Sequence, residues 1–334
     1  MQVDYIKSVD LENKIELENL FHSNSIKSIY QHPDYIENIS NTSYVFLLKE
    51  NKIIKSYCFV NEYALSKLNF IKFSKIKFGS IGSDEHSRVL DLEIINFYKS
   101  NKITFVIYIP FENKIFETIN QKKIKTKTSV RLTGTLILDL RQNISEISKK
   151  YSTNLNRNLK KSKKNNLIVS ELFFEHEFDK LNQIYNTLFE YRNIKVSNSC
   201  FTNDIIKFVT NKKNGFVMGC FENNELIGGA VFIENNGRIE YFIGASNPEF
   251  RNLPILHSVF HEAIILSQKR GYSFFDFGGV VFSKEDIQLN NITKFKYQFC
   301  DNSIFYNKDF EIVLSGYKKK IYDLYLKISN KLNG

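Results

Sequence analysis

The sequence contains an internal repeat, and this feature constrains its fold more than any other. Residues 50–60 and 223–233 each place a polar, Asn-containing turn between two apolar runs, the pattern of a β-hairpin. Their offset is 223 − 50 = 173 residues, about half of the chain. Further along, a helical segment leads into the strand 103–108 and another into the strand 273–277, at an offset of 273 − 103 = 170. Two matches in the same order predict two copies of one α/β unit.

Each copy has antiparallel strands followed by a helix and a further strand, which predicts a mixed sheet covered by helices. The expected strands of the first half are 45–48, 53–60, 67–78 and 103–108, with a helix near 86–99. Those of the second half are 167–174, 215–221, 226–234, 238–243, 273–277 and 303–313, with helices over 145–165, 177–191, 202–211 and 253–269 and a closing basic helix to Leu332. A β-run at 134–138 gives way to a polar helix near residues 139–143. We therefore expect an α/β protein of two tandem domains, 1–143 and 144–334, each with a mostly antiparallel sheet flanked by helices.

The charge of the 334-residue chain indicates what kind of partner it binds. Lys and Arg number 46 against 36 Asp and Glu, a net charge of +10, and hydrophobic residues make up 43%. This hydrophobic content excludes a disordered chain. The positive charge favours phosphate-bearing ligands, nucleic acid or an anionic membrane face. The alternative is an AT-rich genome, which enriches Lys, Asn and Ile throughout a protein.

Targeting and metal-binding signals are not found in the sequence. The N-terminus carries the early Asp4 and no apolar signal-peptide core, and no run approaches the ~18 apolar residues of a membrane span. The four cysteines are far apart and form no CxxC pair, so reduced cysteines are expected. His257 and His261 have a chelating spacing but lack the glutamate of an H-E-x-x-H motif. We expect a cytoplasmic protein that binds no metal.

Two segments of the second half carry a family signature. Residues 271–279 read Gly-Tyr-Ser-Phe-Phe-Asp-Phe-Gly-Gly, and residues 292–299 read Ile-Thr-Lys-Phe-Lys-Tyr-Gln-Phe. With the basic segment 156–164 and the early Gln-His-Pro-Asp-Tyr at 31–35, they resemble the FemAB-like branch of the GNAT acyltransferase superfamily. The resemblance covers nearly the whole chain, and Cys300 stands where the family has a glycine.

This resemblance implies two tandem GNAT-like domains that move an aminoacyl or acyl group onto an amine. The acceptor would be a cell-envelope precursor, meaning a nucleotide- or lipid-linked amino sugar or a muropeptide. Direct attack by the amine needs no covalent enzyme intermediate, and the donor would be aminoacyl-tRNA or acyl-CoA. The expected partners are the envelope precursor, tRNA and an anionic membrane face. One alternative is an acetyl-CoA-dependent N-acetyltransferase of an amino sugar, and another is a non-catalytic module that binds RNA or an anionic glycan.

A loop that would hold a CoA pyrophosphate is not visible. GNAT domains that bind acyl-CoA place a Gly-rich loop before a helix, so that backbone N–H groups meet the phosphates. Residues 244–254 have no glycine after Gly244, and Pro248 and Pro254 each lack an N–H. In the first half, residues 79–83 contain two glycines, which is a weak signal. This pattern favours aminoacyl-tRNA as the donor.

The family segments supply the candidate catalytic residues. Lys296, beside Phe295, can carry charge at the edge of an apolar wall and hold a donor phosphate or stabilise an oxyanion. Asp276 is either a general base with a raised pKa or a cap of the following turn through backbone N–H bonds. Gly278 and Gly279 allow the backbone to approach a ligand or a neighbouring strand closely.

Other candidate substrate-binding residues lie elsewhere in the second half. Arg157, Lys160 and Lys164 fall at spacings of three and four, on one face of a helix. They can bind the phosphates of a nucleotide-linked sugar or of tRNA, although a solvated face is the commoner outcome for such a run. Tyr241 and Glu240 lie on the strand that faces the expected cleft, where sheet packing is the alternative role.

Overall fold

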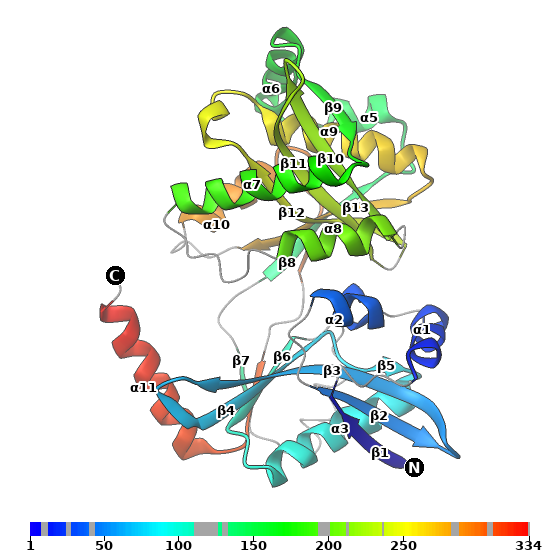
Figure 1. Ribbon diagram of the computed structural model, residues 1–334, viewed down its shortest axis with the longest axis vertical. Coiled ribbons are helices and arrows are strands. Elements are labelled where there is room, and N and C mark those ends of the chain that lie inside the picture. Colours follow the sequence, from blue (N-terminus) through cyan, green and yellow to red (C-terminus); the bar gives the residue numbers. More distant parts are fainter. Residues whose placement is uncertain are drawn as a thin grey trace. The chain divides into compact units, whose positions relative to one another are not determined.

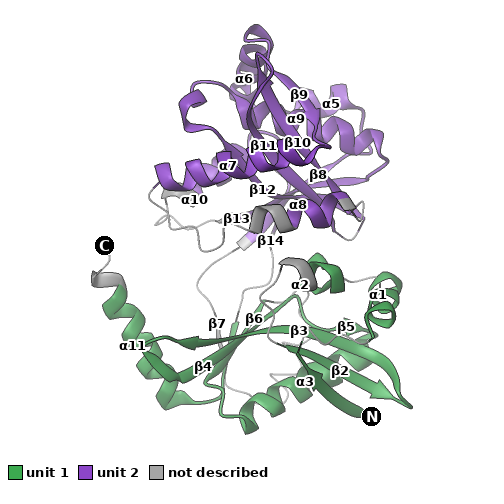
Figure 2. Cartoon of the chain, in the orientation of Figure 1, with its two compact units in different colours: residues 1–132, 306–334 green, residues 133–305 purple. Residues whose placement is uncertain are grey.

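The computed structural model describes residues 1–7, 13–24, 28–39, 44–109, 126–128, 133–192, 201–211, 214–235, 237–281, 287–305 and 310–332. The chain divides into two compact units (Figure 2), one of Met1–Leu132 with Tyr306–Gly334 and one of Thr133–Phe305. Each unit has a mixed, mostly antiparallel sheet with helices packed on it, which confirms the expected fold class.

The first unit is built on an eight-stranded sheet (Figure 1). Its strand order is β1-β2-β3-β4-β6-β15-β7, with β5 paired to β3, and β4 and β6 are parallel. Helix α3 buries an apolar face, which includes Leu90 and Ile94, against this sheet. The elements are β1 Gln2–Ile6, α1 Lys14–Ser23, η2 Ile29–Gln31, α2 Pro33–Ile39, β2 Tyr44–Glu50, β3 Ile53–Leu65, β4 Leu68–Lys77, β5 Ile81–Gly82, α3 Asp84–Ser100, β6 Phe105–Ile109, β7 Thr126–Thr128, β15 Phe310–Val313 and α11 Gly316–Leu332.

The second unit is built on a seven-stranded sheet in the order β14-β8-β13-β12-β11-β10-β9. Strands β12 and β13 are parallel, and α9 connects them. Its core includes Phe232, Phe260 and Phe277, which are buried between the sheet and α9. The elements are β8 Thr133–Asp139, α5 Ile144–Lys149, α6 Thr153–Lys164, β9 Ile168–Glu171, α7 Glu175–Tyr191, α8 Phe201–Asn211, β10 Gly215–Glu222, β11 Glu225–Asn235, β12 Arg238–Ser246, η3 Pro248–Phe250, α9 Ile255–Lys269, β13 Phe274–Val281, α10 Ile287–Lys296 and β14 Ser303–Phe305.

The two hairpins that revealed the repeat have the same geometry. Asn51 and Lys52 join β2 to β3, Asn223 and Asn224 join β10 to β11, and all four residues have positive φ angles. Two consecutive residues with positive φ form the two-residue turn that matches strand twist. Each hairpin also has a register shift at the same distance from its turn. The turns lie at an offset of 223 − 51 = 172, so these hairpins are equivalent.

The chain crosses between the units twice, and the observed division differs from the expected boundary after residue 143. Strand β8 belongs to the second sheet, where it lies between β13 and β14. Strand β15 belongs to the first sheet, between β6 and β7. The expected strand 303–313 was therefore wrong as one strand, because its two ends, β14 and β15, pair in different sheets.

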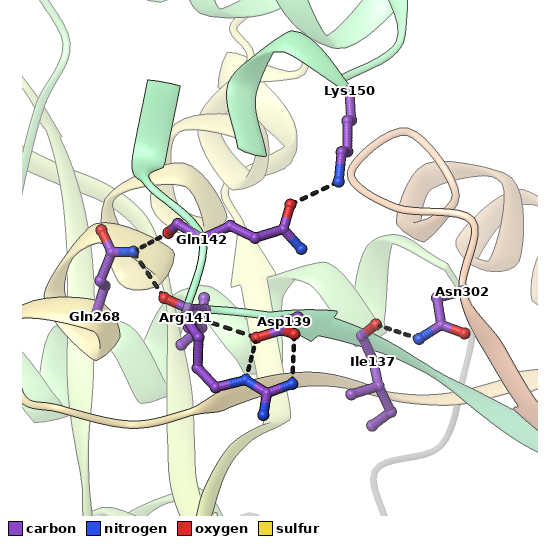
Figure 3. Close-up of polar contacts among 8 residues, drawn as sticks. Ile137, Asp139, Arg141, Gln142, Lys150, Gln268 and Asn302 are labelled. Atoms are coloured by element: carbon purple, nitrogen blue, oxygen red, sulfur yellow. Dashed lines mark hydrogen bonds and ion pairs between the residues drawn. The ribbon is translucent and has the colours of Figure 1, made fainter. Parts of the chain in front are cut away.

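The residues that follow β8 are bonded within the second unit, as Figure 3 shows. The Gln268 side chain on α9 donates from Nε2 to the carbonyl oxygens of Leu140 at 2.7 Å and Gln142 at 2.6 Å. Asn302 Nδ2 donates to the carbonyl oxygen of Ile137 at 3.3 Å. Because of these contacts, residues 139–143 belong to the second unit and do not form a domain boundary.

Candidate active site

The two units differ in how their parallel strands pair. These strands are β4 and β6 in the first unit, joined through α3, and β12 and β13 in the second unit, joined through α9. In the first unit β4 and β6 are paired from Phe73 to Lys77. In the second unit all of β12 and β13 is described, and the two strands pair only at Ile239 and Glu240 of β12. The sheet of the second unit is therefore open beyond Glu240.

Irregularities in both strands account for this opening. One extra residue bulges from β12 against β11, after Tyr241. Another bulges from β13 against β8, between Asp276 and Gly279. An extra residue bends its strand and increases the local twist. Because both bulges follow the last parallel pair, β12 and β13 diverge there.

A cavity of about 400 Å³ lies at this opening. Strand β12 contributes Tyr241, Gly244 and Ser246 to its lining, and α10 contributes Phe295 and Lys296. Three of these residues, Tyr241, Phe295 and Lys296, are candidates that the sequence suggested. The structure thus brings residues separated by more than fifty positions to one cavity.

Helices from both faces of the sheet also line the cavity. A Cβ on Gly229 of β11 would meet a leucine of α7, and one on Gly228 would meet an isoleucine of α9. Successive strand residues point to opposite faces, so α7 and α9 cover opposite faces. Leu188 of α7, Arg192 just after it and Leu256 of α9 all line the cavity. The cavity therefore has lining residues from helices on both faces of the sheet.

Lys296 ends α10 and is 4% exposed. Its Nζ donates a hydrogen bond of 2.7 Å to the carbonyl oxygen of Gly279 and lies 5.4 Å from the ring centroid of Tyr241. Burial lowers its pKa to about 8, and the carboxylates of Asp276 and Glu240 oppose this shift. At neutral pH Lys296 therefore presents an ammonium group to the cavity.

Asp276 lies in β13 and is fully buried. One carboxylate oxygen, Oδ1, accepts hydrogen bonds from the Gly278 N–H at 2.8 Å and from the Thr135 hydroxyl of β8. The other oxygen, Oδ2, lies 3.4 Å from Nη1 of Arg238. Burial raises the pKa of Asp276, and Arg238, Thr135 and Gly278 all oppose this shift. Asp276 caps the β13 bulge, as the turn-cap alternative predicted, and the cavity lining does not include it.

Glu240 is the residue opposite Asp276 in the parallel pair, so the two carboxyl groups are close together. Burial first, and then the charge of Asp276, raise the pKa of Glu240 to about 7. Asn235 Nδ2 donates a 2.6 Å hydrogen bond to Glu240 Oε2. The opening thus holds two basic groups, Arg238 and Lys296, around a carboxyl pair that takes up a proton near neutral pH.

Gly278 and Gly279 have different roles. Gly278 has a φ of +69°, and a Cβ there would lie 2.8 Å from the carbonyl oxygen of Tyr241. A side chain at this position therefore meets both backbone strain and a clash with β12. A Cβ on Gly279 would meet no atom within 4 Å. The close approach expected for both glycines is found at Gly278.

Phe295 and Tyr241 form the apolar wall of the cavity. The Phe295 ring meets His257 edge-on at 4.9 Å and Phe260 at 5.3 Å between ring centroids. Tyr241 lies 4.7 Å from Phe260, and burial raises its pKa to about 12. Both rings therefore pack in the core and also line the cavity.

The basic helix α6 lies outside this cavity. Arg157, Lys160 and Lys164 are all exposed, and the opposite side of α6 packs on α9 through a hydrogen bond from Ser258 to Ser162. Lys160 lines a separate cavity of about 510 Å³. None of the three lines the cavity of Lys296, as far as the described residues extend.

Three residues near the opening were not candidates from the sequence, namely Arg238, Thr135 and Arg192. Arg238 and Glu240 alternate with the buried Ile239, a pattern that places both side chains on one face of the strand. Glu240 was a candidate beside Tyr241, and the charge of Arg238 on the same internal strand was a signal that could have added it. Thr135 and Arg192 had no such signal, because only the tertiary fold brings them near β12 and β13.

The loop between β12 and α9 has little free hydrogen-bonding capacity. Five of its N–H groups donate within the protein, those of Asn247, Glu249, Phe250, Arg251 and Leu253. Pro248 and Pro254 have no N–H to offer. A pyrophosphate cradle needs several free N–H groups aimed at the ligand. The described loop residues are therefore poorly suited to bind a CoA pyrophosphate.

His257 and His261 contact different groups. The Nε2 atom of His257 lies 3.2 Å from Nδ2 of Asn158, and Nδ1 of His261 lies 3.3 Å from the hydroxyl of Tyr151. Within the described ranges, no group of three or more His, Cys, Asp or Glu side chains is placed to hold a metal ion. Across those same ranges, no helix combines the length and apolar character needed to cross a bilayer.

Comparison with known proteins places this arrangement in a known fold. A scan against family models and a search of curated proteins found no match to the sequence. Among solved structures, the chain is similar to FemX with a TM-score of 0.72 and 12% identity, over 97% of this chain and 99% of that one. It is also similar to a protein from Agrobacterium fabrum described as the C-terminal domain of a lysylphosphatidylglycerol synthetase, with a TM-score of 0.66 and 10% identity. That match covers 94% of this chain and 96% of the other.

A third similar structure is a tandem GNAT protein from the clavulanic acid biosynthesis pathway. Its TM-score is 0.54 at 8% identity, over 94% of this chain and 99% of that one. All three matches span nearly the whole of both chains. The chain has the tandem GNAT-like fold that these proteins share.

Proposed function

We propose that the second unit transfers an aminoacyl group onto an amine of a cell-envelope precursor, with Lys296 as the principal catalytic residue. The observation that carries this proposal is a buried lysine, with a pKa of about 8, at a cavity between diverging strands. The sequence resemblance to FemAB-like proteins supports the acceptor class. The similarity in fold to a lysylphosphatidylglycerol synthetase supports a reaction with an aminoacyl donor.

The proposed reaction is a direct displacement. The acceptor amine attacks the carbonyl carbon of the aminoacyl ester, a C–N bond forms, and the carbonyl oxygen becomes negatively charged. The ammonium of Lys296 stabilises this oxyanion, for which the loss of one donor typically costs ~10²–10³ in rate. The C–O bond to the ribose then breaks, and the ribose oxygen leaves with the proton that the amine gives up. No protein side chain needs to become acylated.

The remaining site residues have supporting roles in this proposal. Asp276 and Glu240 keep the Lys296 ammonium charged in spite of its burial. Phe295 and Tyr241 exclude water on one side of the reacting groups. Arg192 lies in the cavity lining and offers a charged group to the phosphate nearest the ester. Exposed Arg157, Lys160 and Lys164 of α6 would bind tRNA phosphates farther from the site.

Aminoacyl-tRNA is the proposed donor because most N–H groups of the loop before α9 already donate within the protein, so few are free for the pyrophosphate of acyl-CoA. Calorimetric titration with acetyl-CoA and with free CoA tests this choice. We expect no binding in the micromolar range. Micromolar binding of either compound would assign the donor to the CoA class and favour an N-acetyltransferase instead.

The catalytic assignment is tested by transfer of a radiolabelled amino acid from tRNA to envelope precursors. Lys296→Ala should lower kcat by about 10²–10³. Lys294→Ala is the matched control, because Lys294 is exposed on the same helix and should keep full activity. If both variants transfer as well as the parent, Lys296 is not catalytic. If the unmodified chain binds RNA tightly and transfers nothing, the protein is a binding module.

A further inference from the structure

Helix α11 contacts the first unit through its first half (Figure 1). The Tyr322 ring lies 4.8 Å from the ring of Phe105. Lys319 is 5% exposed, and its Nζ pairs with Glu311 at 2.9 Å and with Asp323 at 2.5 Å. The charges on the inner face of α11 are therefore paired within the protein, and this face holds the helix in place.

The outer face of α11 is apolar, which is unusual for a helix in water. Tyr317 is 76% exposed, Leu324 59% and Ile328 51%. Their spacings of seven and four place them on one stripe of the helix. The stripe runs for three turns of the helix and begins beside its first residue. A patch of this kind normally marks an interaction surface.

Lysines border the apolar stripe. Lys320 and Lys327 are exposed, and at 100° per residue both lie next to Leu324 on one side of the stripe. Asp323 is the only acidic residue in the sequence of α11, and it pairs with Lys319 on the inner face. The exposed surface of α11 is therefore apolar along its centre and positive at its border.

We propose that α11 docks on an anionic lipid bilayer, with Tyr317, Leu324 and Ile328 inserted among the acyl chains. Lys320 and Lys327 would then meet the lipid phosphates. This arrangement of apolar stripe and bordering lysines is that of a helix lying in the plane of a membrane surface. A second copy of this chain packed antiparallel on α11 is a poorer occupant, since its Lys320 and Lys327 would lie on the same side as these lysines. The inference does not depend on the proposed reaction.

Insertion can be measured directly because the chain contains no tryptophan. Leu324→Trp adds a single reporter to the stripe. With vesicles of phosphatidylglycerol and phosphatidylcholine, its emission should shift to shorter wavelength, and vesicles of phosphatidylcholine alone should give a smaller shift. Ile15→Trp, at a position in α1 that is 76% exposed, is the control and should not shift. No shift from Leu324→Trp would overturn the proposal.

Vesicle flotation with the full chain provides an independent test. L324S/I328S should weaken the partition onto anionic vesicles at least about tenfold, since two apolar side chains no longer insert. K320Q/K327Q should weaken it by several-fold, with the loss largest at low salt. The matched controls I15S and K99Q/K149Q should partition normally. Equal flotation of all variants, or a dimer that L324S/I328S dissociates together with no flotation, contradicts docking on a membrane.

Discussion

At Lys296, burial and electrostatics act in opposite directions. Removal from water favours the neutral amine, whereas Asp276 and Glu240 favour the ammonium, and the resulting pKa is about 8 instead of 10.5. The side chain is therefore charged at pH 7 and neutral well above pH 8. A role in oxyanion stabilisation requires the charged form, so activity is linked to this pKa.

The pH profile of transfer tests that link. In the unmodified protein, kcat/KM should fall about tenfold per pH unit above pH 8, as Lys296 loses its proton. Lys296→Arg keeps its charge throughout this range, so its profile should lack the alkaline decline even though its rate is lower. Rates are corrected for spontaneous hydrolysis of the donor. If Lys296→Arg shows the same decline in kcat/KM, the decline is due to the titration of another group.

Glu240 should make stability depend on pH in the opposite sense to an ordinary carboxylate. Its pKa rises from 4.5 to about 7 on folding, so the folded protein binds this proton more tightly. Its stabilising contribution is complete below about pH 4.5 and is lost as the pH rises through 7. As the pH rises from 5 to 8, the free energy of unfolding of the unmodified protein, measured in urea, should fall by about 1–3 kcal/mol relative to that of Glu240→Gln. Glu249 is exposed, so Glu249→Gln is the control, and its free energy of unfolding should depend on pH as that of the unmodified protein does.

Gly278 and Gly279 offer a matched pair of substitutions. Gly278→Ala should lower the free energy of unfolding by about 2 kcal/mol or more, because φ is +69° and the new Cβ would approach Tyr241. Gly279→Ala should change it by less than about 1 kcal/mol, since no atom lies within 4 Å of the new Cβ. Equal effects in urea unfolding would mean that the β13 bulge can relax.

At the scale of elements, the hairpins were predictable because their signals are local. A polar pair between apolar runs specifies a turn whatever the rest of the chain does. The structure adds the φ angles, +51° and +68° at Asn51 and Lys52 and +49° and +66° at Asn223 and Asn224. Asn tolerates this region of backbone space better than Lys does.

The two turns should therefore respond differently to glycine. Lys52→Gly should raise the free energy of unfolding by about 0.5–1 kcal/mol, because it removes the strain of a lysine at positive φ. Asn224→Gly should raise the free energy of unfolding by less, because asparagine tolerates positive φ better than lysine does. Thermal unfolding measures both, and Lys99→Gly within α3 should instead destabilise the protein. A loss of stability from Lys52→Gly would contradict the turn geometry.

At the scale of the whole molecule, each sheet needs a strand from beyond the expected boundary. Strand β8 lies between β13 and β14, so the second unit is incomplete without it. A fragment of residues 133–305 should unfold cooperatively on its own, whereas a fragment of 144–305 should not. Circular dichroism during heating measures both. Cooperative unfolding of the shorter fragment would show that β8 is dispensable.

The repeat, most elements of the second unit and the choice of Lys296, Phe295 and Tyr241, which line one cavity, could be predicted from the sequence, whereas β1, α1 and α2 were not expected. Turns, apolar alternation and motif spacing depend on residues that are close in the sequence, so they can be recognised without the tertiary structure. The shortage of free N–H groups in the loop before α9 was also predictable, because proline has no backbone N–H in any fold.

The strands that complete each sheet and the charges that meet at the opening could not be predicted from the sequence. Strand pairing joins backbone groups far apart in the chain, and β8 and β15 have no local mark that distinguishes one sheet from the other. The pKa of Lys296 likewise depends on burial and on two carboxylates from different strands. Most of the elements and their repeat follow from local signals in the sequence. The cavity forms where β12 and β13 diverge, and divergence is a property of two strands together, so no local signal predicts it.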